Sequence, residues 1–393
     1  MGKKAFLSAL CLLLLLCGCS KTPTVSSADN DTPAGEAAAI AAPFSCIGSG
    51  DLIASAEFGL TAELTQPLLD MTHAYYRSIG HLALQDTDGL FTDQGENLRH
   101  RAIWHTLIEI RKASSLDLRL TDYHFTVTVT QVHRLNDGRV ELQATEDARY
   151  HFAAIADTLT QQYNTLHTFV LQQGEDGQWR IQFHESDDNP YYNFDYDEAN
   201  GADSRLPEFL QDIAVRQTQA RSSEASQLSA DHPYDRAAAR QYMQTYIEIR
   251  NGAWYAYDDA GGNCQNFGSQ VLLAGGIPMD TEGEAQWYWY DLYDTDLSWI
   301  NVDYFLEYAR TNNGYGLVAD TDIPYYSAQV GDLLIMGDVE PRHTTVITDI
   351  ITDENGNTVD YLLCSNTSNY RNFPAGAYYY TKHWPVQICG WNE

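Results

Sequence analysis

The segment that most constrains the fold of this chain is the run 261–270, Gly-Gly-Asn-Cys-Gln-Asn-Phe-Gly-Ser-Gln. Asn263 is a suitable helix N-cap, and a glycine pair at 275–276 is typical of a helix end. Small or apolar side chains lie between them at spacings of three and four residues: Cys264, Phe267, Val271 and Ala274. This spacing predicts a helix whose buried face carries Cys264 in its first turn.

A cysteine in the first turn of a helix is well placed for a nucleophile. Unpaired backbone N–H groups and the positive end of the helix dipole stabilise a thiolate there. Packing of the helix against a core would hold the Cys264 sulfur in a fixed position. The alternative is that Cys264 is a small, inert core residue, which is the usual role of a lone cysteine.

The N-terminal residues are typical of an export signal. Lysines at positions 3 and 4 precede an apolar run at 5–17, which is too short to span a bilayer. The motif Leu-Cys-Gly-Cys ending at Cys19 resembles a bacterial lipobox, which implies cleavage of residues 1–18 as a lipoprotein signal peptide and lipidation of Cys19. An ordinary signal peptide is the alternative. Polar residues 19–45 are expected to form a flexible tether, so we expect an extracytoplasmic protein anchored to the cell membrane through this lipid alone.

Charge and cysteine content exclude several classes of protein. A net charge of −31 argues against partners such as nucleic acid and against docking on anionic lipid. The 44% hydrophobic residues are too many for a disordered chain. The cysteines beyond the signal are too few for a disulfide scaffold. They are Cys46, Cys264, Cys364 and Cys389. One bridge among Cys46, Cys364 and Cys389 stays open, although Cys364 is expected to be a buried structural thiol.

Residues 46–198 are predicted to form an α+β domain. Helical stripes at 57–84 and 97–112 precede alternating segments that predict antiparallel strands. The strands are expected at 123–133, 140–144, 165–172 and 178–184. Two helices followed by a curving sheet resemble the NTF2-like (SnoaL-like) fold, which implies a cone that holds a ligand or serves as a spacer or dimerising unit. No catalytic set is predicted here, and His100 and His105 are expected to be solvated helix residues without a metal.

A polar connector at 199–232, with a helix expected at 206–218, leads to a second domain at 233–393. This domain contains a helix at 233–250, the Cys264 helix and, later, a hairpin of strands 343–351 and 359–365 around Asn355-Gly356. A two-residue turn would set Asn366 opposite Thr345, so that His343 and Asn366 share a face. A shift by one residue would place them on opposite faces.

A cysteine, then a strand histidine, then an amide on the next strand is the order of a papain-like cysteine site. In this arrangement Cys264 would be the nucleophile, His343 the base and then the acid, and Asn366 the group that orients the imidazole. Backbone N–H groups at the start of the helix would hold the oxyanion, and no metal or cofactor would be needed. Further candidates for substrate or oxyanion binding are Asn263, Gln265, Asn266, Gln270 and Trp287.

The region from 233 to about 385 resembles the bacterial family called the putative amidase domain, within the papain-like NlpC/CHAP group. The resemblance lies in six stretches: 234–238, 263–270, 274–276, 298–302, 331–334 and the strand of His343. The family usually has Asp-Cys-Thr-Asn-Phe, where this chain has Asn-Cys-Gln-Asn-Phe at 263–267. It commonly has a His-Thr pair at the third position, where Asn366-Thr367 stands here.

These features together predict an α+β protein with an NTF2-like N-terminal domain and a papain-like (NlpC/CHAP-type) C-terminal domain. The expected function is a lipid-anchored cysteine hydrolase that cleaves amide bonds, with a peptide or peptidoglycan-like substrate. The alternative is a catalytically silent surface protein that binds wall fragments or small ligands.

Overall fold

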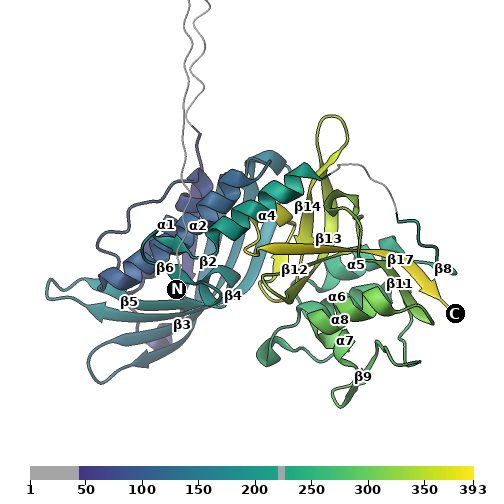
Figure 1. Ribbon diagram of the computed structural model, residues 1–393. Helices are drawn as coiled ribbons and strands as arrows, with labels where there is room; N and C mark the ends of the chain where they lie inside the picture. Colours follow the sequence, from purple (N-terminus) through teal and green to yellow (C-terminus); the bar gives the residue numbers. More distant parts are fainter. Residues whose placement is uncertain (1–43, 220–225) are drawn as a thin grey trace, which may run out of the picture. The chain divides into compact units, whose positions relative to one another are not determined.

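Figure 1 shows the computed structural model, which describes residues 44–219 and 226–393. Residues 44–393 form one compact unit. The predicted signal peptide (1–18), the lipidation site Cys19 and all but the last two residues of the tether (19–45) lie outside the described residues. Among the helices that are described, none is both long and apolar enough to cross a membrane.

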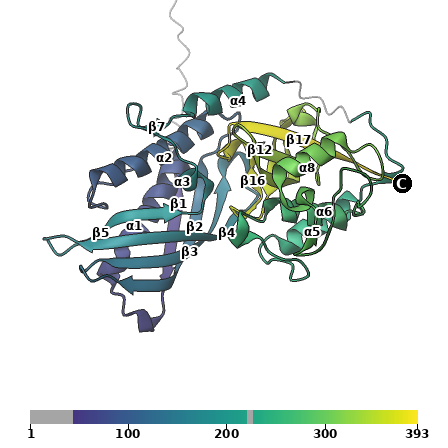
Figure 2. The same cartoon turned by 60° about the horizontal axis from the view of Figure 1, so that its bottom comes forward.

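The N-terminal half consists of two long helices against one face of a curved sheet (Figures 1 and 2). The helices are α1 (Ala62–His81) and α2 (Gln94–Ala113), followed by the single turn α3 (Asn189–Tyr192). The strands are β1 (Ile47–Ile53), β2 (Leu120–Arg134), β3 (Val140–Phe152), β4 (Thr160–Gln173) and β5 (Trp179–Ser186). Their order in the sheet is β1-β2-β3-β4, and β5 also pairs with β4. Strand β1 runs parallel to β2, and the other pairs are antiparallel.

The predicted helices and strands of this half are all present. Each long helix begins at a side-chain cap, since Thr61 accepts the N–H of Leu64 and Asp93 accepts those of Gly95 and Glu96. Burial alternates along β2 as the sequence pattern requires. One expectation is wrong: His100 is fully buried rather than solvated, and its ring nitrogens bond to His184 and to the Glu96 carbonyl. No group of side chains suited to a metal ion occurs among the described residues.

The predicted connector contains α4 (Leu206–Thr218), at the residues expected for a helix, and the two-residue strand β7 (Ala202–Asp203), which pairs with β6 (Tyr196–Asp197) just before the connector. The C-terminal helices are α5 (Arg236–Tyr246), α6 (Cys264–Ala274), α7 (Leu297–Ile300) and α8 (Val302–Thr311). The main strands are β11 (Gly316–Asp320), β12 (Leu333–Gly337), β13 (Pro341–Thr352), β14 (Thr358–Cys364) and β17 (Lys382–Asn392). Short strands complete the half: β8 (His232–Pro233), β9 (Trp289–Asp291), β10 (Asp294–Thr295), β15 (Tyr370–Arg371) and β16 (Phe373–Pro374).

The C-terminal sheet has the order β11-β17-β12-β13-β14-β16, and its two faces belong to different cores. Leu333, Ile335 and Val346 pack with α5, α6 and α8 in one cluster. Leu334 and Met336, which alternate with them, belong instead to the cluster that fills the N-terminal half. The sheet is therefore sandwiched between its own helices and the N-terminal half.

Main-chain pairing also joins the two halves, because Tyr370 and Arg371 of β15 pair with Gln162 and Gln161 of β4. The architecture is mixed α+β with a curved sheet, as predicted, and every pair of strands in that sheet except β1–β2 is antiparallel. The more specific NTF2-like and papain-like resemblances, and the division into 46–198, 199–232 and 233–393, stay predictions.

Candidate active site

The start of α6 is positioned by a glycine turn and by a threonine from a distant loop. Gly261 and Gly262 both have positive φ, 103° and 111°, which side chains rarely tolerate. A Cβ on Gly262 would lie 2.9 Å from the Thr367 hydroxyl oxygen, and that oxygen accepts the N–H of Asn263 at 2.8 Å. The turn before Cys264 therefore needs glycine at position 262, because a side chain there would keep the loop that carries Thr367 from approaching the start of α6.

Asn263 occupies the N-cap position of α6, but its side chain does not cap the helix. Its Oδ1 accepts the N–H of Tyr257 at 3.1 Å, and its Nδ2 donates to Asn366 Oδ1 at 2.9 Å. The Asn366 amide donates in turn to the carbonyl of Ile247 at 3.4 Å. The structure thus brings Asn366 to the N-terminus of α6, where it braces the residue before Cys264.

Cys264 lies where the sequence predicted it, at the first residue of α6, and it is 7% exposed. Burial raises the pKa of its thiol, while the backbone N–H groups of Thr344 and Gln265 oppose that rise. These N–H groups approach the sulfur and would stabilise a negative charge there. Burial thus favours the thiol, and the two N–H groups favour the thiolate.

The hairpin that carries His343 differs from the predicted register by one residue. Asp349 pairs with Leu362, as expected, but Ile347 pairs with Leu363. Thr348 is the extra residue of a β-bulge, and its hydroxyl donates to the Leu362 carbonyl at 3.0 Å. The one-residue shift reverses the faces of everything beyond the bulge, so the predicted shared face of His343 and Asn366 is wrong.

His343 accordingly leaves β13 on the face opposite α6. The next residue, Thr344, faces the helix, since its hydroxyl donates to Gln265 Oε1 at 2.6 Å. The His343 ring is 2% exposed and stacks on Tyr380, with ring centroids 5.7 Å apart. Burial lowers its pKa to about 4, and its Nε2 is buried without a hydrogen-bond partner. Among the described side chains, no hydrogen bond joins this imidazole to Cys264 or to Asn366.

The other predicted binding residues are engaged inside the protein. Gln265 Nε2 donates to Ser269, Asn266 Oδ1 accepts from Trp299, and Gln270 Oε1 accepts from Tyr242. Trp287 is wholly buried and its indole N–H donates to Ser269 at 3.1 Å. Trp287 therefore belongs to the core and forms no wall of a substrate cleft, since its ring presents no face to solvent.

A cavity of about 520 Å³ adjoins the start of α6. Gly261, Gly262 and Thr367 line it from the C-terminal half, and Tyr192 lines it from the N-terminal half. Tyr192 and Tyr380 are hydrogen bonded; burial raises the pKa values of both hydroxyls, and the nearby Cys264 raises them further. All four charged side chains of the lining are acidic: Glu185, Asp187, Asp258 and Asp259.

Sequence reasoning missed Thr344, Thr367 and Tyr380. Thr344 contributes through its backbone N–H and Thr367 through a loop in which Thr367 and Ser368 have positive φ, 71° and 52°. A backbone donor carries no residue signature, and tyrosines are too common in this chain to single out one. The four described cysteines, Cys46, Cys264, Cys364 and Cys389, are free thiols, and Cys364 is buried as expected.

Two comparisons with known proteins bear on the C-terminal half. Residues 233–388 match the family described as "Putative amidase domain". A stretch of 118 residues is 31% identical to the uncharacterized protein YhbB of Bacillus subtilis (strain 168). That stretch covers 29% of this chain and 37% of the relative's length. The family match supports a general role in amide hydrolysis for the C-terminal half.

Proposed function

We propose that the C-terminal half hydrolyses amide bonds with Cys264 as its nucleophile. The observation that carries this proposal is the setting of the sulfur at the N-terminal end of α6. The N–H groups of Thr344 and Gln265 approach it there, and a cavity of about 520 Å³ is lined by Gly261 and Gly262, just before the helix, although Cys264 itself does not line it. Both features suit a reaction in which negative charge develops on sulfur and then on a carbonyl oxygen.

The reaction would proceed through a thioester. The Cys264 sulfur attacks the carbonyl carbon as its proton passes to a base, and the C–N bond then breaks as the amine leaves with a proton. Water hydrolyses the thioester, releasing a carboxylate and restoring the thiol. Each cycle therefore consumes one water and needs no oxidant or reductant.

His343 is the proposed base, although its imidazole lies on the opposite face of β13 from α6. Its free Nε2 and its stacking on Tyr380, which lies near Cys264, motivate the assignment. For this role the His343 side chain must move from its present position to reach the sulfur. Asn366 acts in this proposal by fixing Asn263, and not by orienting the imidazole.

The lining of the cavity favours substrates that carry a positive charge. Four carboxylates line it, and Arg250 pairs with one of them, Asp258, at 2.6 Å. Peptide amides that bear an ammonium group suit the negative potential of these carboxylates. Cell-wall stem peptides are the proposed source of such substrates. Anchoring through a lipid on Cys19 would place the enzyme outside the membrane, facing that material.

The test is digestion of purified cell-wall peptides by the chain from residue 20 onward. Cys264→Ala is expected to lower the rate by roughly 10³-fold or more. Cys389→Ala, which removes a half-buried thiol away from α6, is the matched control and should leave the rate unchanged. Full activity in Cys264→Ala would rule out the mechanism.

A second candidate function is a catalytically silent binding module, and the separation of His343 from Cys264 favours it. The two are distinguished by the pH dependence of Cys264 alkylation by iodoacetamide, located by mass spectrometry. A midpoint well below about 8.5, together with product release, supports the enzyme. A midpoint at or above that value, with no product, supports the silent module.

A further inference from the structure

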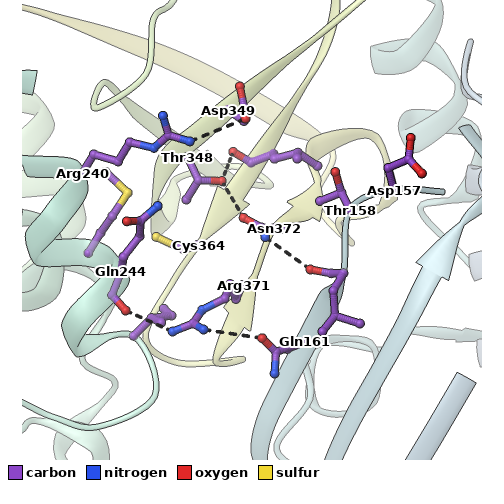
Figure 3. A pocket seen from close by; sticks show the side chains of 14 residues that line it. Asp157, Thr158, Gln161, Arg240, Gln244, Thr348, Asp349, Cys364, Arg371 and Asn372 are labelled. Carbon is purple, nitrogen blue, oxygen red and sulfur yellow. Dashed lines mark hydrogen bonds and ion pairs between the residues drawn. The ribbon is translucent and has the colours of Figure 1, made fainter. Parts of the chain in front are cut away.

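A second cavity, of about 480 Å³, lies between the halves on the other side of Ile247 from Asn366. Figure 3 shows Arg240 and Gln244 reaching into it from α5 on one side, and Asp157, Thr158 and Gln161 lying on the other. Its volume suits a small molecule. Neither Cys264 nor His343 lines this cavity, so it is separate from the candidate active site.

Arg371, in the lining of this cavity, is a charged group with only neutral partners. Its Nη1 is 3.5 Å from Gln161 Oε1 and its Nη2 donates to the Gln244 carbonyl at 3.1 Å. Its Nε is buried without a hydrogen-bond partner, and among the described residues no carboxylate pairs with it. A guanidinium stays charged in proteins, and this one lies over the Tyr163 ring, 5.7 Å from the ring centroid, with no described carboxylate paired with it.

The absence of a counter-ion is notable because acidic residues are abundant. The chain has 54 aspartates and glutamates against 23 lysines and arginines. Arg101, Arg111 and Arg134 also have no ion pair with a described carboxylate, but none of them lines this cavity. Arg371 lacks one where a cavity is present, which points to a carboxylate that arrives with a ligand.

Arg240 provides a second guanidinium. It contacts Asp349 at 3.7 Å, and both side chains are about half exposed. An exposed pair at that distance contributes little, so Arg240 can turn to a ligand at small cost.

Asn372 holds the neighbouring backbone in place. It has a φ of 54°, its Oδ1 accepts from Thr348 at 3.2 Å and its Nδ2 donates to the Leu159 carbonyl at 3.2 Å (Figure 3). Thr160 also donates to the Asn372 carbonyl, at 2.9 Å. These bonds to both halves fix the position of Arg371 before any ligand binds, which reduces the entropy lost on binding.

We propose that this cavity binds a small-molecule carboxylate, with Arg371 as the principal contact and Arg240 as the second. The planar guanidinium of Arg371 matches the two oxygens of a carboxylate. Gln161 and Gln244 supply uncharged hydrogen-bonding groups beside it. The site stands independently of the proposed amide hydrolysis, because it uses none of the same residues.

The test uses succinate as the probe, titrated into the folded protein in a calorimeter at constant ionic strength. We expect saturable binding to one site. Arg371→Gln should weaken it at least about tenfold. Arg371→Lys should restore only part of the loss, because an ammonium lacks the paired N–H donors with which a guanidinium binds both carboxylate oxygens. Arg240→Gln, on an exposed helix face, should weaken it several-fold without risk to the fold.

Arg310→Gln is the matched control. Arg310 is half exposed on α8, pairs with Glu307 and does not line the cavity, so its loss changes the net charge equally. Succinate affinity should be unaltered in this variant. Failure of succinate to saturate, or an equal effect of Arg310→Gln and Arg371→Gln, would overturn the proposal.

Discussion

Three buried histidines form a chain of hydrogen bonds in the N-terminal half. His100 Nδ1 lies 2.9 Å from the Glu96 carbonyl, which can only accept, so His100 carries its proton there. His184 then donates to His100 at 2.8 Å, and His167 donates to His184 at 2.9 Å. His167 Nε2 is left as an acceptor 3.6 Å from a carboxylate oxygen of Glu146. The Glu96 carbonyl at one end of this series of hydrogen bonds therefore determines which ring nitrogen of each histidine carries the proton.

Glu146 is the residue of this cluster whose charge should be most visible in stability. Burial raises its pKa to about 7 from a usual 4.5, and Tyr76 donates to it at 2.5 Å. A carboxyl whose pKa is raised on folding contributes stability below pH 4.5 and loses it as the pH rises through 7. The quantity to follow is the difference in the free energy of unfolding between the wild type and Glu146→Gln. It should fall by about 3 kcal/mol as the pH rises from 4.5 to 7.

Urea denaturation at several pH values measures this difference. Glu307→Gln, at an exposed position on α8, is the control for loss of one negative charge. A difference between wild type and Glu146→Gln that stays constant from pH 4.5 to 8 would contradict a raised pKa for Glu146.

Single residues were predictable from sequence where local spacing sets their position. Asn263 and Cys264 lie at the start of α6 because the three- and four-residue spacing continues to Ala274. The partners of side chains were not predictable. Asn263 bonds to a residue 103 positions away, and His100 to one 84 positions away. Such pairs follow from tertiary packing, which no local pattern encodes.

At the scale of elements, α6 packs closely on β13 through Gly268. A Cβ there would lie 2.9 Å from Thr344 Cγ2, and that side chain is held by its bond to Gln265. Overpacking of this kind costs about 1–3 kcal/mol, while alanine gains up to about 1 kcal/mol of helix propensity. Gly268→Ala should therefore lower the free energy of unfolding by roughly 1–2 kcal/mol in chemical denaturation.

Gly252→Ala is the control, because nothing lies within 4 Å of a Cβ at that position and its φ is not positive. It should change stability little. Equal effects of the two substitutions would mean that α6 can move away from β13 at no cost.

The strands and helices themselves were largely predictable, whereas the register of the β13–β14 hairpin was not. The turn and the alternation indicate a hairpin, but the bulge at Thr348 has no glycine to mark it. Its hydroxyl bonds to Leu362 and to Asn372, outside the local sequence. Two register shifts, one beside the turn between Ile351 and Thr352 and one at Thr348, thus decided the face on which His343 lies, and with it the geometry of the candidate site.

At the scale of the whole molecule, the two halves share one core and should unfold together. Leu334, Met336 and Tyr361 of the C-terminal sheet lie in the same buried cluster as Trp104 and Phe125. Hydrogen exchange followed by mass spectrometry should give the same opening free energy for the slowest amides of β3 and of β12. Loss of β12 protection at lower denaturant than β3 would indicate that the halves fold separately.

The two residues of β15 have an effect beyond joining the halves. They occupy the exposed edge of β4 at Gln161 and Gln162. Without them, β4 would present free main-chain donors and acceptors on which a strand of another copy could add. Displacement of these two residues would therefore do more than loosen the contact between the halves, since it would leave the main-chain groups of Gln161 and Gln162 free to pair with another strand.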